Sequence, residues 1–589
     1  YGLCENEPDR TANGFDISGN VLPTSGNVKN SEATLEKYKT YSTDWQRLMY
    51  RTAYSYDHQL SVNGGSESVQ YNASLGYTDQ QGIIMNTGVE RFAFRLGVMA
   101  KLSKKLTLRA NSSYTITSQQ QTSHSQAASM NQMIRRILTT KPYLMPGDKI
   151  YEDEDVAYVA ADNPYVMATE LKDNMKQKFA LANASLTYVI IPGLSAKAGF
   201  NFNGNSGSRY TYYPIGTNAG NQYNGMAFRA ESDRQNMVME TTINYDKKIR
   251  KSHRINAVIG YTYEDRQNTT LSVQVGDFTN NDLLYNAIGE ATNTIAKGSN
   301  VVRTKMSSFI GRVNYTLLDK YIFTATGRYD GSSILAPENQ WAFFPSAAFA
   351  WRINQEPFLK SVKEISNIKL RLSYGLTGNQ NIGFAAPYAI MNHVRGYIGG
   401  EVVHGISNGS LPSPDLGWEN TKTYNVGLDL GFFKNRFRIT ADAYRRDTDN
   451  MLMNFGIPQS SGYNTIALNA GQIRNQGVEV AVGADILTKA VKWSVGGNIY
   501  LNRNRVIDLD DNEMLGQVYL AGGGVFNSSI HITREGYPIG SFYGYVVDGV
   551  YQNEAEAKAA PFDSPQATPG SLRYKDISGK AGFPDGQIK

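Results

Sequence analysis

The stretch VQYNASLGYTD, residues 69–79, alternates between apolar and polar side chains. One face of the extended chain would carry Val69, Tyr71, Ala73, Leu75 and Tyr77. A period of two predicts a β-strand with one apolar face. That face would point into a dry core in a soluble sandwich, but out into lipid in a membrane barrel.

The same alternation returns in about sixteen segments between His58 and Arg503, most of them about nine to thirteen residues long. Clear examples are residues 90–102, 106–116, 194–203, 254–264, 368–377, 423–431 and 493–502. Tilted strands of about nine to eleven residues cross a bilayer, whereas strands of globular proteins average about five or six. The length of the segments therefore favours a barrel.

The connections between these segments alternate between short and long. The short ones are residues 65–68, 103–105, 190–193, 246–253, 318–320, 354–367, 431–436 and 487–492. The long ones are residues 79–89, 117–176, 204–234, 265–304, 330–342, 378–420, 446–472 and those after 504. Outer-membrane barrels have short periplasmic turns and long extracellular loops, and a Greek-key sandwich has no reason to sort its loops this way. We therefore predict an all-β fold, a large antiparallel transmembrane β-barrel.

Aromatic residues gather next to the short connections. Those at strand ends there are Tyr188, Tyr245, Tyr315, Tyr321, Phe437 and Trp493. Tyr is a good strand former anywhere. Their common position nevertheless favours the aromatic girdle of a barrel at one membrane surface.

The composition excludes several other classes of protein. The formal net charge is +5, the mean hydropathy is −0.41, and no apolar run approaches the ~18 residues of a spanning helix. The single Cys4 excludes an internal disulfide framework, and the mixed charges show no basic face for nucleic acid. Residue 1 opens without a secretory signal, so we expect that a leader has been removed or that the sequence begins inside a longer protein.

The sequence holds no recognisable catalytic constellation. Its six His residues are scattered, and the common zinc-protease, nucleophile-elbow and phosphate-loop motifs do not occur. We therefore expect no enzyme.

Charged residues occupy the polar faces of many segments. We predict as lumen-facing Arg95, Arg109, Glu240, Arg312, Arg328, Lys369, Arg371, Asp429, Asp442 and Glu479. A charge on the lipid face would cost about 2–4 kcal/mol near mid-membrane, so this placement is required by physics. It leaves two interpretations open: a solvated wall with cross-strand ion pairs, or a surface that grips a plug domain or a substrate.

Several longer stretches carry a resemblance to a known family. They include RYDGSS (328–333), PDLGWENTKTYNVGLDL (414–430), NAGQIRNQGVEV (469–480) and REGYPIGSFYGYVVDGVYQ (534–552). Others are TDWQRLMYRTA (43–53), HQLSVNGGSE (58–67) and the block at 341–382. Taken in their order along the chain, they resemble the SusC/RagA family of TonB-dependent outer-membrane transporters of Bacteroidetes, over essentially the whole chain.

The resemblance implies a 22-stranded barrel with an N-terminal plug and a TonB-contacting segment. It implies one further strand before residue 1 and five after the last, so the chain would be the barrel portion of a larger protein. Residues 1–57 would be an outer-loop segment leading into the barrel. Residues 58–503 would be barrel strands with extracellular loops, and residues 504–589 a late extracellular loop that stops before the final strands.

The function that this resemblance implies is active import of oligosaccharides or oligopeptides across the bacterial outer membrane. Its partners would be a SusD-like surface lipoprotein acting as a lid, the TonB complex, membrane lipid, and, as an option, a second transporter–lid pair in a dimer. A passive porin or a surface adhesin is the alternative.

Substrate contacts are expected in the long loops, because sugars stack on aromatic rings and hydrogen-bond to amides. The candidates are Tyr210, Tyr212, Tyr213, Tyr223, Trp341, Asn379, Gln380 and Trp418; the other interpretation is that these residues pack the loops against each other. Residues 125–140 show a helical apolar stripe and would form an outer-loop helix. We expect no cofactor, although the acid-rich stretches 507–513 and 576–586 leave calcium as a minor option, since neither supplies a full ligand set.

Overall fold

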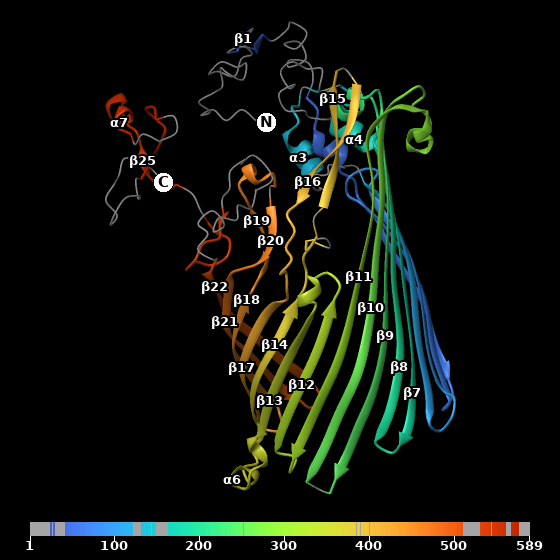
Figure 1. Ribbon diagram of the computed structural model, residues 1–589, viewed down its shortest axis with the longest axis vertical. Helices are drawn as coiled ribbons and strands as arrows, with labels where there is room; N and C mark the ends of the chain where they lie inside the picture. The colour runs from blue at the N-terminus through green and yellow to red at the C-terminus, as the bar shows by residue number, and fades with distance from the viewer. Residues whose placement is uncertain are drawn as a thin grey trace. The chain divides into compact units, whose positions relative to one another are not determined.

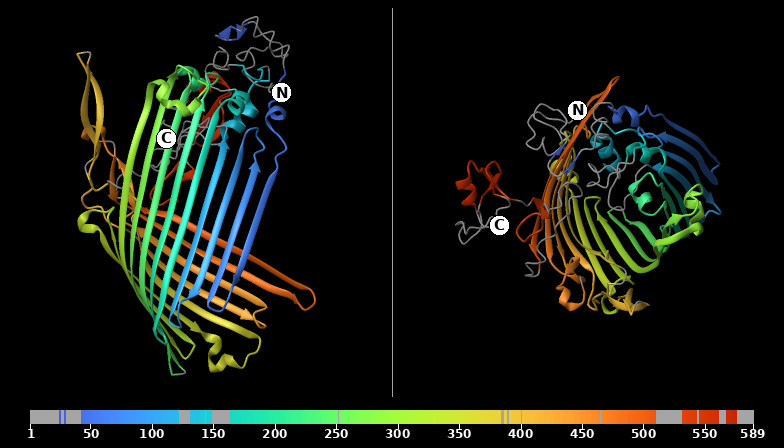
Figure 2. Two further views of the ribbon diagram at one scale, coloured as in Figure 1. Left: turned by 90° about the vertical axis from the view of Figure 1, so that its right-hand side faces the viewer. Right: turned by 90° about the horizontal axis from the view of Figure 1, so that it is seen from above.

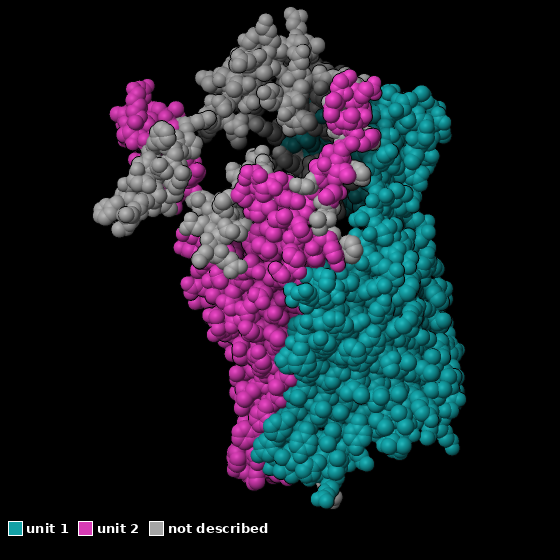
Figure 3. Space-filling model, in the orientation of Figure 1, with its two compact units in different colours: residues 1–345 teal, residues 346–589 magenta. Residues whose placement is uncertain are grey.

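The computed structural model describes residues 42–121, 131–142, 144–148, 163–250, 252–383, 386–388, 390–399, 401–463, 465–509, 531–542, 545–560 and 567–575, with Thr24–Ser25 and Val28–Lys29. The chain divides into two compact units, residues 1–345 and 346–589, which Figure 3 colours separately. The predicted boundary at residue 504 falls inside strand β22 (Lys492–Asp508), the segment that follows is only partly described, and stretch 576–586 lies outside the described residues.

Sixteen strands form one antiparallel sheet in the order β22-β21-β18-β17-β14-β13-β12-β11-β10-β9-β8-β7-β6-β5-β4-β3. In residues 1–345 they are β3 (Ser55–Gly65), β4 (Val69–Gln81), β5 (Gly88–Lys101), β6 (Leu106–Gln121), β7 (Lys172–Ile191), β8 (Leu194–Tyr213), β9 (Met226–Ile249), β10 (His253–Phe278), β11 (Ala291–Leu317) and β12 (Tyr321–Ser332). β13 (Trp341–Arg352) carries the unit boundary. It is followed by β14 (Ile365–Asn379), β17 (Glu419–Phe432), β18 (Phe437–Asp449), β21 (Gln472–Thr488) and β22 (Lys492–Asp508). The predicted strand count is confirmed.

Smaller elements decorate the connections. The two-stranded pairs are β1 (Thr24–Ser25) with β2 (Val28–Lys29), β15 (Ile390–Ile398) with β16 (Glu401–Ser410), β19 (Leu452–Gly456) with β20 (Thr465–Asn469), β23 (His531–Ile532) with β24 (Ser541–Phe542), and β25 (Val547–Val550) with β26 (Leu572–Tyr574). The helices are α2 (Trp45–Met49), α3 (Asn131–Thr139), α4 (Pro164–Thr169), α5 (Asn218–Gln222), α6 (Pro357–Lys360), α7 (Glu554–Lys558), η3 (Leu284–Glu290), η4 (Pro337–Asn339), η5 (Ile353–Gln355) and η6 (Gln459–Ser461). Among the described residues, no helix has the length and apolar character needed to cross a bilayer.

The apolar face of the sheet is exposed rather than packed in a core. Leu75 is 43% exposed, Ile259 61% and Leu501 69%, and neither Phe94 nor Leu108 is buried. A soluble monomer rarely leaves so extensive an apolar surface in water. These side chains therefore lie on a lipid-facing surface, and the polar residues between them lie on the inward face.

The buried clusters of residues 1–345 lie instead in the longer connections and at the strand ends next to them. Trp45 and Met49 of α2 pack with Met133 and Ile137 of α3, as part of one cluster. Figure 1 shows α3 and α4 at one end of the strands of this unit, and the short turns at the other end. The outer-loop helix expected over 125–140 is thus present as α3, and residues 125–130 lie outside the described part.

Several of the short turns at the opposite end are closed by left-handed backbone. Gly193 between β7 and β8 has a φ of 88°, which glycine adopts without steric cost. Leu318 and Asp319, between β11 and β12, have φ values of 56° and 58° although both carry a Cβ. Tight hairpins favour such turns because their twist matches that of the flanking strands.

Two of the predicted long connections, 204–234 and 265–304, are wrong in extent. β8 continues to Tyr213, β9 begins at Met226, β10 runs to Phe278 and β11 begins at Ala291, side by side in Figure 2. Beyond the lipid belt both faces of a strand meet water, so the apolar alternation stops while the backbone ladder goes on. Polar cross-strand pairs take over there, as between Arg303 and Asp265, whose Nε and Oδ1 are 2.9 Å apart.

Candidate functional site

A row of asparagine side chains crosses the inward face of β3 to β8. The residues paired from strand to strand are Asn63, Asn72, Gly97, Asn111, Asn183 and Asn201. We call the five amides of this series the asparagine row. Each amide offers two N–H donors and one carbonyl acceptor, so the row is a dense array of both kinds of group.

Gly97 is the one member without a side chain, and its neighbours use the space. A Cβ at Gly97 would lie 2.2 Å from Oδ1 of Asn72 and 2.9 Å from Oδ1 of Asn111. Next along the row, Nδ2 of Asn111 donates to Oδ1 of Asn183 over 3.0 Å. The absence of a side chain at Gly97 of β5 therefore leaves room for the amides of Asn72 on β4 and Asn111 on β6.

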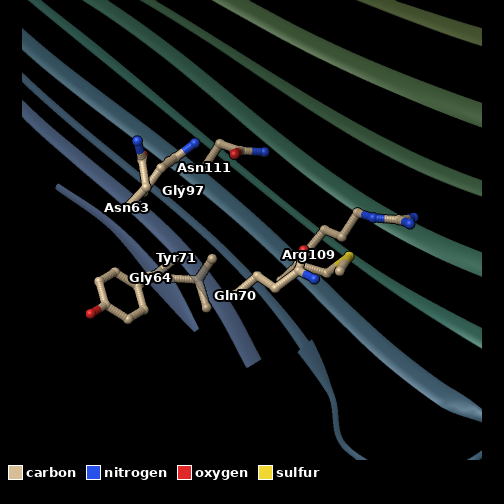
Figure 4. Close-up of a pocket in the computed structure, with 10 residues that line it drawn as sticks. Asn63, Gly64, Gln70, Tyr71, Gly97, Arg109 and Asn111 are labelled. Atoms are coloured by element: carbon tan, nitrogen blue, oxygen red, sulfur yellow. The ribbon is translucent and has the colours of Figure 1, made fainter. Parts of the chain in front are cut away.

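The row borders two adjoining hollows of about 400 and 520 Å³. Ser61, Ser74, Arg95 and Ser113 lie on the longer-connection side of the row, and Gln70 and Arg109 on the short-turn side. Figure 4 shows Arg109 and Asn111 projecting on one side, with the ring of Tyr71 turned away from them. The lining of the two hollows thus consists largely of uncharged hydrogen-bonding groups, with Arg95 and Arg109 as its charged side chains.

The ten predicted lumen-facing charges alternate with outward apolar residues in the sheet. In residues 1–345 these are Arg95, Arg109, Glu240, Arg312 and Arg328, and in residues 346–589 they are Lys369, Arg371, Asp429, Asp442 and Glu479. Some make local pairs: Nζ of Lys197 lies 3.5 Å from Oε1 of Glu240. Nε of Arg328 donates to buried Asp330 over 2.7 Å.

Arg371 is the centre of the strongest network on the inward face of residues 346–589. Its guanidinium donates to both oxygens of Asp429 over 3.0 and 2.9 Å, and to both oxygens of Asp442 over 2.9 Å. Gly427 of β17 is paired with Arg371 on one side and Asp442 on the other, and a Cβ at this glycine would be 2.5 Å from Arg371 Cζ. Glu479 lies opposite Asp442 on the next strand and adds a third carboxylate beside this network. Doubly bidentate pairing fixes the position of the guanidinium.

The four predicted tyrosines of the first loop lie in different environments. Tyr212 and Tyr213 are buried, at 2% and 8% exposure, in two separate clusters, and Tyr223 packs at the edge of the second. Tyr210 is half-buried, donates to Glu231 over 3.0 Å and stacks under Arg229, whose Cζ lies 4.3 Å from the ring centre. Burial, with a contribution from the Asp282 carboxylate, raises the pKa of Tyr212 to about 12. Its hydroxyl therefore stays protonated and bonds to the side chain of Asn281.

The other four predicted contact residues also have different local surroundings. Trp341 stacks on Tyr329 with ring centres 4.9 Å apart, on the outward face of the sheet. Trp418 is buried. Asn379 is exposed and donates to Glu419 over 3.1 Å, and Gln380 follows it directly. Within residues 1–345, the five predicted residues therefore lie in separate local environments rather than in one site.

Metal-binding clusters are absent from the described part of the chain, where no three His, Cys, Asp or Glu side chains gather closely enough. Of the two acid-rich stretches, residues 510–513 and 576–586 lie outside that part.

The asparagine row was not predicted from the sequence. Only the register of the strands reveals this row, because its five amides belong to five different strands and the strand pairing places them side by side. A register derived from the short turns would have found it.

Comparison with known proteins agrees with this geometry. The family described as TonB dependent receptor-like, beta-barrel, matches residues 139–578. The chain belongs to this family. TonB-dependent receptor P3 of Formosa agariphila is 30% identical over 550 residues, which are 91% of this chain and 54% of that receptor. TonB-dependent receptor SusC of Bacteroides thetaiotaomicron is 28% identical over 569 residues, 89% of this chain and 54% of SusC.

This TonB-dependent receptor barrel spans about half the length of the curated relatives it matches. Among solved structures, the RagAB peptide transporter superimposes with a TM-score of 0.75 at 22% identity, covering 93% of this chain and 62% of that one. The resemblance to the SusC/RagA family and the β-barrel fold class are therefore confirmed. The protein is an outer-membrane protein, and its family is one of receptors rather than enzymes.

Proposed function

We propose that the protein to which this chain belongs imports oligosaccharides or oligopeptides across the outer membrane, driven through a TonB complex. Family membership supports the TonB dependence. The asparagine row supports the substrate class, because hydroxyl-rich and amide-rich polymers both need many donors and acceptors of low net charge. The similarity to SusC and to the RagAB peptide transporter is compatible with either polymer.

A SusD-like lipoprotein lid and the TonB complex are the partners we propose. The basis is the similarity to SusC and RagAB, and a dimer of transporter–lid pairs is a further proposal of the same kind. Contacts of substrate with the eight loop residues stay predictions. Tyr210 and Asn379 are more accessible than buried Tyr212, Tyr213 and Trp418.

The test is uptake by cells that carry the full-length protein, with a fluorescent oligoglucan and a fluorescent oligopeptide as probes. We expect uptake of one probe and its loss when the proton-motive force is dissipated. Uptake that survives the uncoupler would instead identify a passive porin, and binding without uptake would identify an adhesin.

A double variant tests whether the asparagine row, rather than the inward face in general, binds the transported probe. Asn111→Leu with Asn183→Leu removes two amides, each worth about 0.5–1.5 kcal/mol as a hydrogen-bond partner. We expect affinity for the transported probe to fall about tenfold or more. The matched control is Asn314→Leu, on the inward face of β11 but outside the row. Equal losses in both would remove the row from the proposal.

A further inference from the structure

The outward face of residues 346–589 changes abruptly from apolar to basic. Across five strands, the last apolar series of paired residues is Leu372, Val426, Ala443, Val478 and Leu501. Val426, Val478 and Leu501 are 51%, 47% and 69% exposed, as lipid-facing side chains are. The strands concerned, β14, β17, β18, β21 and β22, are labelled in Figure 1.

The next two paired series, toward the longer connections, carry five basic side chains. We call Lys422, Arg445, Arg474, Arg503 and Arg505 the basic patch. Asp447 is the one acidic residue in these two series. Asp449 and Asp508 follow in the series beyond them. Positive charge therefore exceeds negative charge where the apolar belt ends.

The existing ion pairs do not neutralise the patch. Asp447 accepts from Arg445 over 2.8 Å and from Arg474 over 2.6 Å, so one carboxylate serves two guanidinium groups. Lys422 donates to Asp449 over 2.8 Å. Within the part of the chain that the structure describes, no carboxylate lies within ion-pair distance of Arg503 or Arg505, and both are exposed.

The arrangement of two of these residues is unfavourable by itself. Arg474 lies directly opposite Arg505 in the β21–β22 ladder. Like charges at paired positions of an antiparallel ladder are destabilising. An anion held between the two guanidinium groups would turn this repulsion into attraction, and phosphate suits the fork of donors that arginine presents.

We propose that the basic patch binds the phosphate-bearing headgroup of an outer-leaflet lipid, whose acyl chains lie on the apolar series below it. The position of the basic patch is the reason for choosing a lipid as its ligand. The patch lies on the outward face and continues the lipid-facing surface without a break, on the side of the longer connections. A headgroup there places its phosphate beside Arg474, Arg503 and Arg505 while its chains stay in hydrocarbon.

The experiment uses the full-length protein in detergent and measures its binding of bisphosphorylated lipid A by native mass spectrometry. Arg503→Gln with Arg505→Gln is the test variant. Lys489→Gln with Lys492→Gln is the matched control, because it removes the same charge beside the short turn of the same two strands. Each basic residue near an anionic lipid surface contributes about 1 kcal/mol, so the test variant should bind about 30-fold more weakly.

The expected pattern is loss in the test variant, retention in the control, weaker binding of dephosphorylated lipid A, and further weakening by salt. The proposal is overturned if both variants lose lipid A binding equally, or if the test variant loses none. It is also overturned if dephosphorylated lipid A binds as tightly as the bisphosphorylated form, or if inorganic phosphate displaces lipid A as effectively as free lipid A does. Loss of a co-purifying lid protein with lipid binding intact also overturns it, in favour of a protein partner. The proposal depends on the basic patch and on the outer-membrane location, and not on the proposed import function. Import of either probe can therefore fail without affecting it.

Discussion

Val480 of β21 lies directly opposite Ile499 of β22, and both share the outward apolar face. The neighbouring Ala481 lies on the inward face, one residue away along the same strand. Two adjacent positions therefore meet different media, lipid on one side and a polar interior on the other.

This relationship predicts opposite tolerance to charge. Val480→Arg should lower the free energy of unfolding by about 2–4 kcal/mol, because the guanidinium would lie in the lipid belt. Ala481→Arg should change it by less than about 1 kcal/mol. Urea unfolding in lipid vesicles, followed by the mobility of the folded band, measures both. Equal tolerance would mean that the faces are assigned the wrong way round.

The turn between β11 and β12 should accept a stabilising substitution. Leu318 and Asp319 both adopt left-handed φ values, which cost about 1–2 kcal/mol per residue for side chains with a Cβ. Leu318→Asn with Asp319→Gly gives the pair that such turns favour. We expect a gain of about 1–2 kcal/mol in the same unfolding assay.

The control for this gain is Lys104→Gly in the turn between β5 and β6, where the backbone is not left-handed. Glycine has nothing to relieve there and should leave stability unchanged or lower. A gain at Lys104 equal to that at the test turn would assign the effect to chain flexibility.

Gly427 should resist substitution because of the network around it. Gly427→Ala places a Cβ 2.5 Å from both Arg371 Cζ and Asp442 Oδ1, so we expect a loss of about 1–3 kcal/mol by overpacking. Gly497→Ala on β22 meets nothing within 4 Å and should be neutral. In an Arg371→Met background the cost of Gly427→Ala should shrink, and a double-mutant cycle measures this coupling. An unchanged cost would separate the glycine from the ion pairs.

Tyr212 gives the protein a dependence on alkaline pH. Its pKa in the folded chain is raised to about 12, above the ordinary value of 10.0, because burial disfavours the phenolate. The stability that this protonated hydroxyl contributes is fully present below pH 10, where unfolded tyrosine also keeps its proton. It is lost as pH rises from about 10 to about 12.

The measurement is a difference titration of tyrosinate absorbance between the wild type and Tyr212→Phe. The subtraction isolates one hydroxyl, and its midpoint should lie near pH 12. Below pH 10, Tyr212→Phe should also lower stability by about 1 kcal/mol through loss of the bond to Asn281. A midpoint near 10 would show that Tyr212 is solvated.

The lipid belt was predictable from sequence because one physical rule sets it. Leu75 and Tyr77 need hydrocarbon and Ser74 needs water, so the alternation itself records the two faces. The rule fails where both faces are wet. The outer parts of β10 and β11 were interpreted as a long connection for that reason, although Asp265 and Arg303 continue the ladder there.

The candidate site was less predictable, because it depends on register rather than composition. Tyr212 and Tyr213 are adjacent in sequence, yet strand geometry sends their rings to opposite faces and into different clusters. Asn63 and Asn183 are far apart in sequence and share one series of paired residues. Local chemistry suggested an aromatic ligand site, whereas pairing across six strands, β3 to β8, creates an array of five amides.

The unexpected length of β9, β10 and β11 has a mechanical consequence. β11 continues for about 60 Å of extended chain beyond Phe309 of the lipid belt, at about 3.3 Å per residue. A hydrogen-bonded ribbon loses less freedom than a flexible loop when a molecule settles on it. A molecule that binds at the tip of this ribbon therefore binds a rigid extension of the sheet. The number of residues in the strands fixes how far that extension reaches above the bilayer surface.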